Sequence, residues 1–295
     1  MIPAKPDQIT ADMKAATLIE SLGWLRRFHG KVVVIKFGGN AMVDSELKKT
    51  FAEDVAYLRY VGIKPVVVHG GGPQITAKLK ELGIESEFRH GFRYTDEVSI
   101  QVVKDVLRNE ISRELAELIE QAGAAAAVMS GEDENLFKAE IVKAKTDDGE
   151  VDLGLVGEVR TVNPGIALRA IDSGKVPVVS TVAPTVTGQL LNVNADLAAS
   201  SLAVALGAEK LMVLTDVPGL YANWPDTDSL VSEISSDELR QLLSKLESGM
   251  IPKMQACLAA VDGGVGSAHI IDGRTPHSIL LEIFTEAGVG TLVTK

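Results

Sequence analysis

The chain has 295 residues, of which 46% are hydrophobic, and this is enough for one large α/β domain or two lobes with a substantial core. It has 29 Lys and Arg against 40 Asp and Glu, and this net charge of −11 argues against a nucleic-acid partner, because general nucleic-acid binding comes from clustered basic residues. The single cysteine, Cys257, excludes an intrachain disulfide framework and a cysteine-rich metal site.

No apolar stretch reaches the roughly 18 residues of a membrane span, and the first ten residues lack the apolar core of a signal peptide. We therefore expect no membrane partner and an intracellular location, either cytoplasmic or in a plastid stroma.

The first predicted element is a helix over residues 8 to 28. Leu18, Leu22 and Leu25 follow one another at helical spacing and form an apolar stripe. Such a stripe has to be buried against its own lobe or against another subunit. The pattern alone slightly favours packing within the chain.

An apolar strand at 31–36 then carries Lys36 directly to Gly38 and Gly39. Glycines let the backbone approach a ligand closely, and a lysine adds a mobile charge, so the pattern is typical of a phosphate site. Alternatively, Lys36 ends a buried strand and reaches water, while the glycines form an ordinary turn. This motif alone leaves both interpretations open.

The next segment repeats the order of strand, glycine loop and helix. A helix at about 46–61 and a strand at 65–69 lead into the glycines 70–72, and Pro73 suits the first turn of the next helix. Parallel strands joined by right-handed crossovers bring both glycine loops to the same edge of the sheet. This coincidence favours a functional site over two unrelated turns.

Residues 84–94 predict a short hairpin, and Thr95 is expected to cap a long helix over 96–122. Arg93 lies between them and could grip a carboxylate with two hydrogen bonds or lie on the solvated surface. The following segments are predicted as a strand at 124–130, antiparallel ribbons within 131–162 with a turn at 147–149, a helix to about 171 and a strand at 175–179.

A polar cluster, NVNAD at 192–196, precedes the next helix. Side chains of an extended chain alternate between its two faces, so Asn192 and Asn194 lie on the same face. Asp196 then enters a helix that ends at Gly207. One interpretation is that Asn194 caps the helix and that the helix dipole stabilises Asp196 in the first turn. The other is that the cluster belongs to a functional site.

A second αβ series begins after Gly207, where we place a lobe boundary. Its first strand, at 211–215, runs into a loop with Tyr221 and Trp224, which could pack on a base or fill a core edge. Lys253 lies in the first turn of a helix, where a cation is unfavourable, and this makes it more noteworthy than other surface lysines. A strand at 268–272, a helix at about 276–287 and a closing strand within 288–294 complete the chain.

The common nucleotide-binding motifs are absent. Gly-Lys occurs at 30–31 and 174–175 with Val after each, which excludes a Walker-type loop, and HGGGPQ lacks the spacing of the dinucleotide fingerprint. The five histidines show no paired metal-ligand spacing, so we expect no metal site built by the protein itself.

Six motifs in order resemble the amino acid kinase family: KFGGN at 36–40, HGGGPQI at 69–75, FRYTD at 92–96, NVNAD at 192–196, TDVPGLY at 215–221 and GMIPKM at 249–254. The resemblance covers about residues 30 to 295 and is greatest to the members that phosphorylate N-acetyl-L-glutamate. It implies an α/β fold, an open three-layer αβα sandwich with a mainly parallel central sheet, preceded by an N-terminal helix. Residues 1–28 would serve oligomerisation, 29–207 would form an N-lobe for the acyl amino acid, and 208–295 a C-lobe for ATP and an arginine site.

The resemblance also implies an activity: ATP phosphorylates the side-chain carboxylate of N-acetyl-L-glutamate, the second step of arginine biosynthesis. Because the nucleophile is already ionised, the reaction needs in-line placement of two anions and charge neutralisation, and no general base. Mg²⁺ would be bound through the ATP phosphates.

Two alternatives are kept. One is another kinase of the family, such as a glutamate 5-kinase, a carbamate kinase or a UMP kinase, although Arg93 and the NVNAD cluster favour an amino acid derivative over UMP. The other is a noncatalytic ligand-sensing module, which would be expected to lack Lys36, Asp196 or Lys253, and all three are present.

Matching positions imply the site residues. Lys36 and Lys253 would flank the transferred phosphoryl group, and Asp196 would orient both. The remaining contacts implied are Gly38, Gly39 and Gly71 for phosphate, Gly71, Gly72, Arg93 and Asn192 for the acyl amino acid, and Thr215, Asp216, Gly219 and Tyr221 for the nucleotide.

The N-terminal helix resembles that of the arginine-inhibited members, in which such helices interlace dimers into a hexamer, a trimer of dimers. This revises the preference for packing within the chain. The tail, Glu282-x-Phe284 followed by Gly288-Val289-Gly290-Thr291, resembles the arginine-site signature of that group. It implies that His269, Glu282 and Gly288 contact inhibitory L-arginine. A PII-type signalling protein is kept as a candidate partner.

Overall fold

The centre of the molecule is an eight-stranded sheet. The computed structural model describes residues 11–146, 149–247, 249–285 and 288–295. The strands lie in the order β14 (Glu233–Ser235), β16 (Thr291–Thr294), β15 (Ser267–Asp272), β11 (Lys210–Thr215), β1 (Val32–Phe37), β2 (Lys64–His69), β8 (Val176–Ser180) and β5 (Ala126–Ser130). Neighbours run parallel except β15 and β16. The predicted mainly parallel sheet is confirmed.

The central strands are buried on both faces. Along β1, Val33 and Ile35 pack into the core on one face and Val34 into the core on the other, and all three are fully buried. A sheet covered on both sides needs such continuous apolar strands. This is why the strands read as unbroken apolar runs in the sequence.

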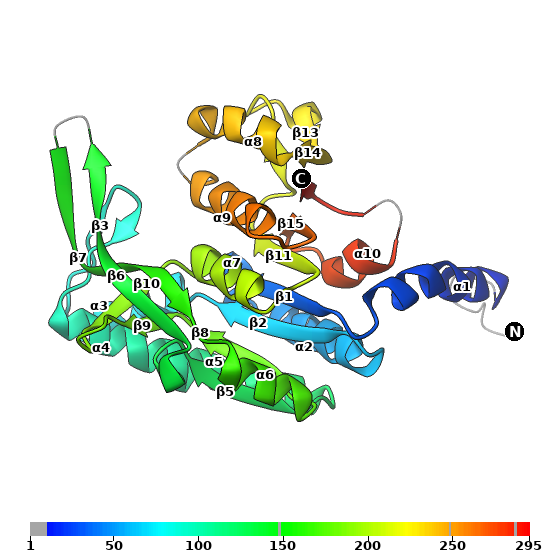
Figure 1. Ribbon diagram of the computed structural model, residues 1–295, viewed down its shortest axis with the longest axis horizontal. Coiled ribbons are helices and arrows are strands. Elements are labelled where there is room, and N and C mark those ends of the chain that lie inside the picture. Colours follow the sequence, from blue (N-terminus) through cyan, green and yellow to red (C-terminus); the bar gives the residue numbers. More distant parts are fainter. Residues whose placement is uncertain (1–10, 147–148, 248, 286–287) are drawn as a thin grey trace, which may run out of the picture.

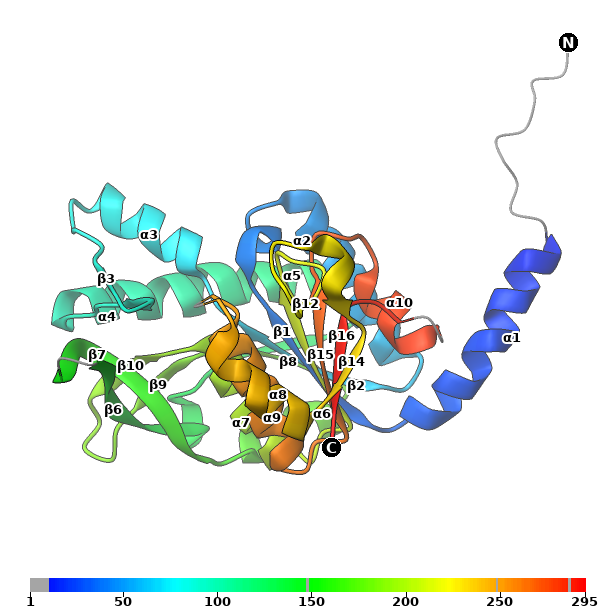
Figure 2. The same cartoon turned by 90° about the horizontal axis from the view of Figure 1, so that it is seen from above.

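Helices cover both faces and complete the three layers (Figure 2). The layer with α2 (Ser45–Tyr60), α3 (Gly72–Glu81), α4 (Glu97–Asp105), α5 (Ser112–Gln121) and α10 (Ser278–Phe284) shares one core. The other layer contains α6 (Gly165–Asp172), α7 (Ala195–Ala205), α8 (Ser236–Leu242) and α9 (Ile251–Asp262). The predicted sandwich is confirmed.

Smaller sheets lie at the edges. A four-stranded sheet has the order β6 (Phe137–Thr146), β7 (Gly149–Val162), β10 (Leu190–Val193) and β9 (Val182–Pro184), and its turn at 147–148 lies outside the described residues. The hairpin expected within 84–94 is β3 (Phe88–Arg89) paired with β4 (Phe92–Arg93), and β12 (Leu220–Tyr221) pairs with β13 (Leu230–Val231). The ribbons and the first hairpin are confirmed.

The helix start predicted at Thr95 is wrong by one residue. Asp96 caps α4, because its side chain accepts a hydrogen bond from the Ser99 N–H at 2.7 Å. Thr95 is buried, and its hydroxyl donates to the Arg93 carbonyl. The long helix predicted over 96–122 is also interrupted by a π-helical segment, Val106–Ile111, which joins α4 to α5.

The first helix, α1 (Ala11–Phe28), extends away from the body of the molecule (Figures 1 and 2). Leu18 is 66% exposed and Leu22 is 50% exposed, whereas Phe28 at the end of the helix is buried. Packing of this stripe within the chain, which the pattern alone favoured, is therefore wrong for Leu18 and Leu22, whereas Leu25 packs against the core. Residues 8–10 of the predicted helix, and 286–287 of the last one, lie outside the described residues.

The central sheet is continuous across Gly207, where the lobe boundary is predicted. β11 pairs directly with β1, with Val33 opposite Lys210. β1, β2, β11 and β15 run in the same direction, so all four end at one edge of the sheet. The two glycine loops and the loop after β11 therefore meet there.

Candidate active site

Lys36 and Asp196 meet at this edge of the sheet. Lys36 is the last residue but one of β1, and Asp196 lies in the first turn of α7. Lys36 Nζ lies 2.8 Å from Asp196 Oδ1, and both side chains are buried. Asn194 caps α7 by accepting hydrogen bonds from the N–H groups of Asp196 and Leu197. Asn194 therefore caps the helix and also fixes the turn that places Asp196 against Lys36.

Lys253 reaches the same carboxylate from α9. Its Nζ lies 3.2 Å from Asp196 Oδ2, so each carboxylate oxygen faces one lysine. A cation in the first turn of a helix is unfavourable by itself, and Asp196 offsets that cost. The Lys253 side chain is 21% exposed against 8% for Lys36, so Lys253 is the more exposed of the two lysines. The three predicted catalytic residues lie together.

The ionisation of Asp196 is set by two opposing effects. Burial raises the pKa of a carboxyl group, but the attraction of Lys36 and Lys253 outweighs burial and holds the pKa of Asp196 below its ordinary value. The carboxylate is therefore charged at neutral pH, and the cluster of one anion and two cations has a net positive charge. Such a cluster can bind a phosphoryl group and neutralise charge that develops on it.

Side chains at the two glycines after Lys36 would displace charged groups of the site. A Cβ on Gly38 would collide with the Lys36 ammonium group. Gly39 has a φ of +75°, and a Cβ there would lie 2.5 Å from an Asp216 carboxylate oxygen. The Asn40 N–H donates to Asp216 Oδ1 at 2.8 Å. Asp216, predicted to bind the nucleotide, therefore lies directly against the predicted phosphate loop.

A cavity of about 450 Å³ opens beside the second glycine loop. Its lining includes Gly71 and Gly72 as well as Ala195, the residue before Asp196. A Cβ on Gly71 would lie 2.5 Å from the end of the Ile111 side chain, so any larger residue here would have to displace that side chain. Helix α3 begins at Gly72 without a side-chain cap, which leaves its first N–H groups free of a side-chain acceptor.

Arg93 is a buried cation in the wall of this cavity. Its guanidinium donates to the Gly72 carbonyl at 3.0 Å, to Thr76 Oγ1 at 2.7 Å and to Ser86 Oγ. Burial lowers its pKa from the ordinary value. Within the described part of the chain it forms no ion pair with a carboxylate. A buried positive charge without a counter-charge suits an anionic ligand.

Asn192 lies in the same wall. Its Nδ2 donates to the Thr95 hydroxyl at 3.3 Å, and its side chain lines the cavity together with Arg93. The structure therefore brings together Gly71, Gly72, Arg93 and Asn192, which the sequence predicts to bind one ligand.

The residues predicted to bind the nucleotide gather in the loop after β11. Thr215 ends that strand and is buried, and Gly219 packs against Thr291, where a Cβ would lie 2.6 Å from the hydroxyl oxygen. Tyr221 packs against Trp224 with ring centroids 5.3 Å apart. The loop is linked to the phosphate loop through Asp216.

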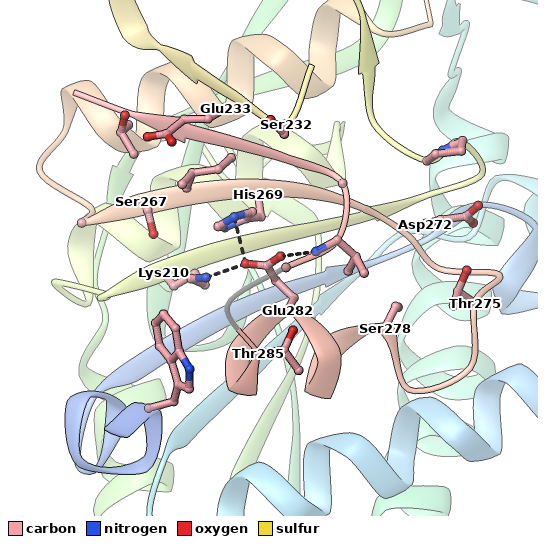
Figure 3. A pocket seen from close by; sticks show the side chains of 18 of the residues that line it. Lys210, Ser232, Glu233, Ser267, His269, Asp272, Thr275, Ser278, Glu282 and Thr285 are labelled. Atoms are coloured by element: carbon pink, nitrogen blue, oxygen red, sulfur yellow. Dashed lines mark hydrogen bonds and ion pairs between the residues drawn. The ribbon is translucent and has the colours of Figure 1, made fainter. Parts of the chain in front are cut away.

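A larger cavity, of about 780 Å³, lies near the end of α1 (Figure 3). Glu282 points from α10 toward β11 and β15, where its Oε1 lies 2.9 Å from Lys210 Nζ and 2.8 Å from His269 Nε2. Its Oε2 accepts a hydrogen bond from the Val289 N–H at 2.9 Å. Gly288, with a φ of +56°, lies against the same carboxylate. The three residues predicted to bind arginine therefore share one cavity.

The titratable side chains around the Glu282 carboxylate differ in their charge at neutral pH. Burial favours the neutral form of Glu282, but His269 and Lys210 outweigh burial and lower its pKa to about 2. Burial also lowers the pKa of His269, so His269 is neutral at neutral pH and Lys210 is the charged partner. The His269 Nδ1 is buried and has no hydrogen-bond partner among the residues that the structure describes.

Several contacts of these sites were not predicted from the sequence. Lys210 opens an apolar strand, and a lysine there reads as a strand end that reaches water. Thr76, Ser86 and Thr95 touch Arg93 or Asn192, and short polar residues of this kind have no distinguishing pattern. Only the pairing of distant segments in the fold could have shown these four residues.

Two features are absent from the described residues. No group of three or more His, Cys, Asp or Glu in that part of the chain is placed to hold a metal ion. None of its helices is long and apolar enough to cross a membrane.

Comparison with solved structures shows the fold. N-acetylglutamate synthase from Neisseria gonorrhoeae superimposes with a TM-score of 0.83 at 24% identity, over 98% of this chain, and this chain spans 64% of that longer one. Giardia carbamate kinase superimposes with a TM-score of 0.67 at 20% identity, over 90% of this chain and 99% of that one.

Sequence comparison gives higher identities. Acetylglutamate kinase from Clavibacter michiganensis subsp. michiganensis is 62% identical over 292 residues, which are 98% of this chain and 96% of the relative. Acetylglutamate kinase from Leifsonia xyli subsp. xyli is 58% identical over 289 residues, 97% of this chain and 96% of the relative. The sequence profile of the amino acid kinase family matches residues 31–272. The chain belongs to the amino acid kinase family.

Proposed function

We propose that this protein acts as an acetylglutamate kinase, which transfers the γ-phosphoryl group of ATP to the side-chain carboxylate of N-acetyl-L-glutamate, the second step of arginine biosynthesis. The observation that carries the proposal is Arg93, a buried cation without a carboxylate partner among the described residues, in a cavity that ends next to the Lys36, Asp196 and Lys253 cluster. Relatives of 56–62% identity that are named acetylglutamate kinase support this choice of substrate.

The reaction joins two anions, the acceptor carboxylate and the γ-phosphate of ATP. The acceptor carboxylate is already ionised, so it attacks phosphorus without a base, and repulsion between the reactants is the main obstacle. Lys36 and Lys253 neutralise charge on the transferred group, and Asp196 keeps both ammonium groups in place. The N–H groups of Gly38, Gly39 and Gly71 donate to phosphate oxygens.

The two substrates occupy opposite sides of this cluster. Arg93 holds the α-carboxylate of N-acetyl-L-glutamate, and Asn192, Gly71 and Gly72 complete the acceptor site. ATP lies along the loop that contains Thr215, Asp216, Gly219 and Tyr221, with residues 29–207 and 208–295 as acceptor and nucleotide lobes.

Magnesium is expected to bind through the phosphates of ATP, where it neutralises negative charge. The residues present fit this arrangement, because the buried acid of the cluster, Asp196, is already paired with two lysines and is not free to hold a metal ion.

The larger cavity is proposed to bind L-arginine as a feedback inhibitor. Glu282 offers a carboxylate to a guanidinium group, Lys210 offers a cation to a carboxylate, and His269 and Gly288 complete the contacts. Trp24, Arg27 and Phe28 of α1 line the same cavity, so a ligand there would touch the helix that extends from the body.

The assembly is proposed to be a hexamer, a trimer of dimers joined through α1, in the cytoplasm. The exposed Leu18, Ile19 and Leu22 supply an apolar surface for such a contact. A PII-type signalling protein is kept as a candidate partner of that ring.

The activity is tested by a coupled assay of ADP release with N-acetyl-L-glutamate, glutamate, aspartate, carbamate and UMP as acceptors. We expect the fastest turnover with N-acetyl-L-glutamate. Faster turnover with free glutamate or another acceptor would contradict the proposal.

Arginine inhibition is tested by titrating L-arginine into the same reaction. Glu282→Gln should weaken inhibition at least tenfold, because the guanidinium loses a charged partner. Glu117→Gln, at an exposed position of α5, is the matched control. Equal inhibition of both variants would remove Glu282 from the arginine site.

A further inference from the structure

His69 and Ser112 form a buried polar pair that the proposed mechanism does not use. His69 ends β2 immediately before the glycine loop, and Ser112 begins α5. Both residues are fully buried. His69 Nδ1 lies 2.9 Å from the Gly70 carbonyl oxygen, and His69 Nε2 lies 2.6 Å from Ser112 Oγ.

These contacts determine where the imidazole proton lies. A carbonyl oxygen can only accept, so Nδ1 must carry the hydrogen that it donates to Gly70. Burial lowers the pKa of His69 to about 4, and the ring is therefore neutral at neutral pH. Nε2 is then an acceptor, and Ser112 donates its hydroxyl hydrogen to it. The Gly70 carbonyl thus selects the tautomer, and the Ser112 hydroxyl adapts to it and anchors the other side of the ring.

The Gly70 carbonyl matters because it shares a peptide plane with the Gly71 N–H. In a trans peptide the two groups point in opposite directions, so fixing the carbonyl on the imidazole also fixes the direction of the N–H, away from the ring. Adjacent glycines restrict their own backbone least of all residues. The direction of the Gly71 N–H therefore depends on an outside contact.

The helix that supplies Ser112 also packs under the loop. Leu107 and Ile111 belong to the π-helical segment just before Ser112, and a Cβ on Gly71 would lie 2.7 Å and 2.5 Å from their side chains. Such π-helical insertions are frequent at functional sites. Here the insertion brings one hydroxyl and two apolar side chains against the loop.

We propose that His69 and Ser112 are positioning residues for phosphoryl transfer: Ser112 orients the His69 ring, and His69 holds the Gly70 and Gly71 peptide so that the Gly71 N–H serves the reacting groups. This inference rests on the proposed function, in which Gly71 contacts phosphate and acceptor. Neither side chain touches the substrates.

The test compares steady-state kinetics of the full chain and four variants. His69→Leu removes both contacts, and we expect kcat to fall roughly 100-fold, as for a misplaced catalytic contact, while KM for ATP changes less than threefold. His69→Asn restores a donor near the position of Nδ1 and should recover kcat to within about fivefold of the wild type.

Ser112→Ala should lower kcat about tenfold, since His69 keeps its hydrogen bond to Gly70 but loses the partner that orients its ring. Ser130→Ala is the matched control, because Ser130 is also fully buried and its hydroxyl makes one long hydrogen bond among the described residues, 3.5 Å to the Val182 carbonyl. It should leave kcat unchanged.

The inference is overturned if His69→Leu keeps kcat within threefold of the wild type, or if His69→Asn is as slow as His69→Leu. If His69→Leu does not fold, Ser112→Ala decides, and a kcat equal to that of Ser130→Ala overturns the inference. Wild-type turnover with each acceptor tests the proposed function separately, because the variants are compared on whichever acceptor the wild type prefers.

Discussion

Asp196 and Lys253 lie 57 residues apart in the chain, yet they form an ion pair of 3.2 Å, and Lys36 faces the other oxygen of the same carboxylate at 2.8 Å. One buried acid therefore sets the positions of two cations that come from different ends of the chain. Removing either lysine leaves the other paired, so the fold should tolerate the loss better than the chemistry does.

Lys253→Ala should lower kcat by about 10²- to 10³-fold, because one of two charges that neutralise the transferred group is lost. The melting temperature should change by only a few degrees, since this side chain is partly exposed and Asp196 keeps Lys36. Lys245→Ala, at an exposed position before α9, is the control. Near-normal turnover of Lys253→Ala would refute its role.

Arg93→Lys should raise KM for N-acetyl-L-glutamate by roughly 10- to 100-fold with a smaller change in kcat, because an ammonium group cannot replace the planar fork of the guanidinium. Arg89→Lys is the matched control in the same hairpin, where Arg89 pairs with the exposed Glu87. If both variants keep the wild-type KM for the acceptor, Arg93 does not bind its carboxylate.

Much of the fold could be predicted because the central strands are apolar on both faces. The strand that ends at Lys36 and the one that ends at His69 each read as a buried run followed by glycines, and parallel pairing then placed both loops at one edge. The clustering of Lys36, Asp196 and Lys253 was implied only by resemblance, since no local pattern gives a distance between segments so far apart in the chain.

What the sequence could not predict depends on tertiary contacts. Thr95 and Asp96 are both good caps, and the choice between them follows from burial of Thr95 against the hairpin. Lys210 has the pattern of a strand end until α10 packs against β11 and β15 and brings Glu282 to it. The sequence also could not show how the stripe of α1 divides, because Leu25 packs against the core of the body whereas Leu18 and Leu22 are exposed.

Leu18→Glu combined with Leu22→Glu should convert the proposed hexamer to dimers and weaken arginine inhibition, because charges replace an exposed apolar stripe. Deletion of residues 1–26 should do the same, but it also removes Trp24 from the arginine cavity, so the double variant separates assembly from ligand contact. Lys14→Ala with Glu20→Ala on the same helix is the control. Light scattering measures the mass, and an unchanged hexamer in the double variant would contradict the prediction.

His69 predicts how stability depends on pH. An ordinary histidine in the unfolded chain binds a proton near pH 6.5, whereas burial keeps His69 neutral in the folded state down to about pH 4. Between these values the unfolded state binds more protons, so the free energy of unfolding rises with pH. The wild type should therefore lose up to about 3 kcal/mol as the pH falls from 6.5 to 4 through this group.

His69→Asn should remove that loss. Asp54 acts in the opposite direction, because burial raises its pKa to about 6, and its contribution to stability is lost as the pH rises from 3.8 to 6. This contribution is the same in the wild type and in His69→Asn, so it cancels when the two are compared. Urea unfolding at several pH values and one protein concentration measures the difference. His90→Asn is the control, since His90 is exposed and has a φ of +49° that asparagine tolerates. Parallel curves for the wild type and His69→Asn would show that His69 is not held neutral in the folded protein.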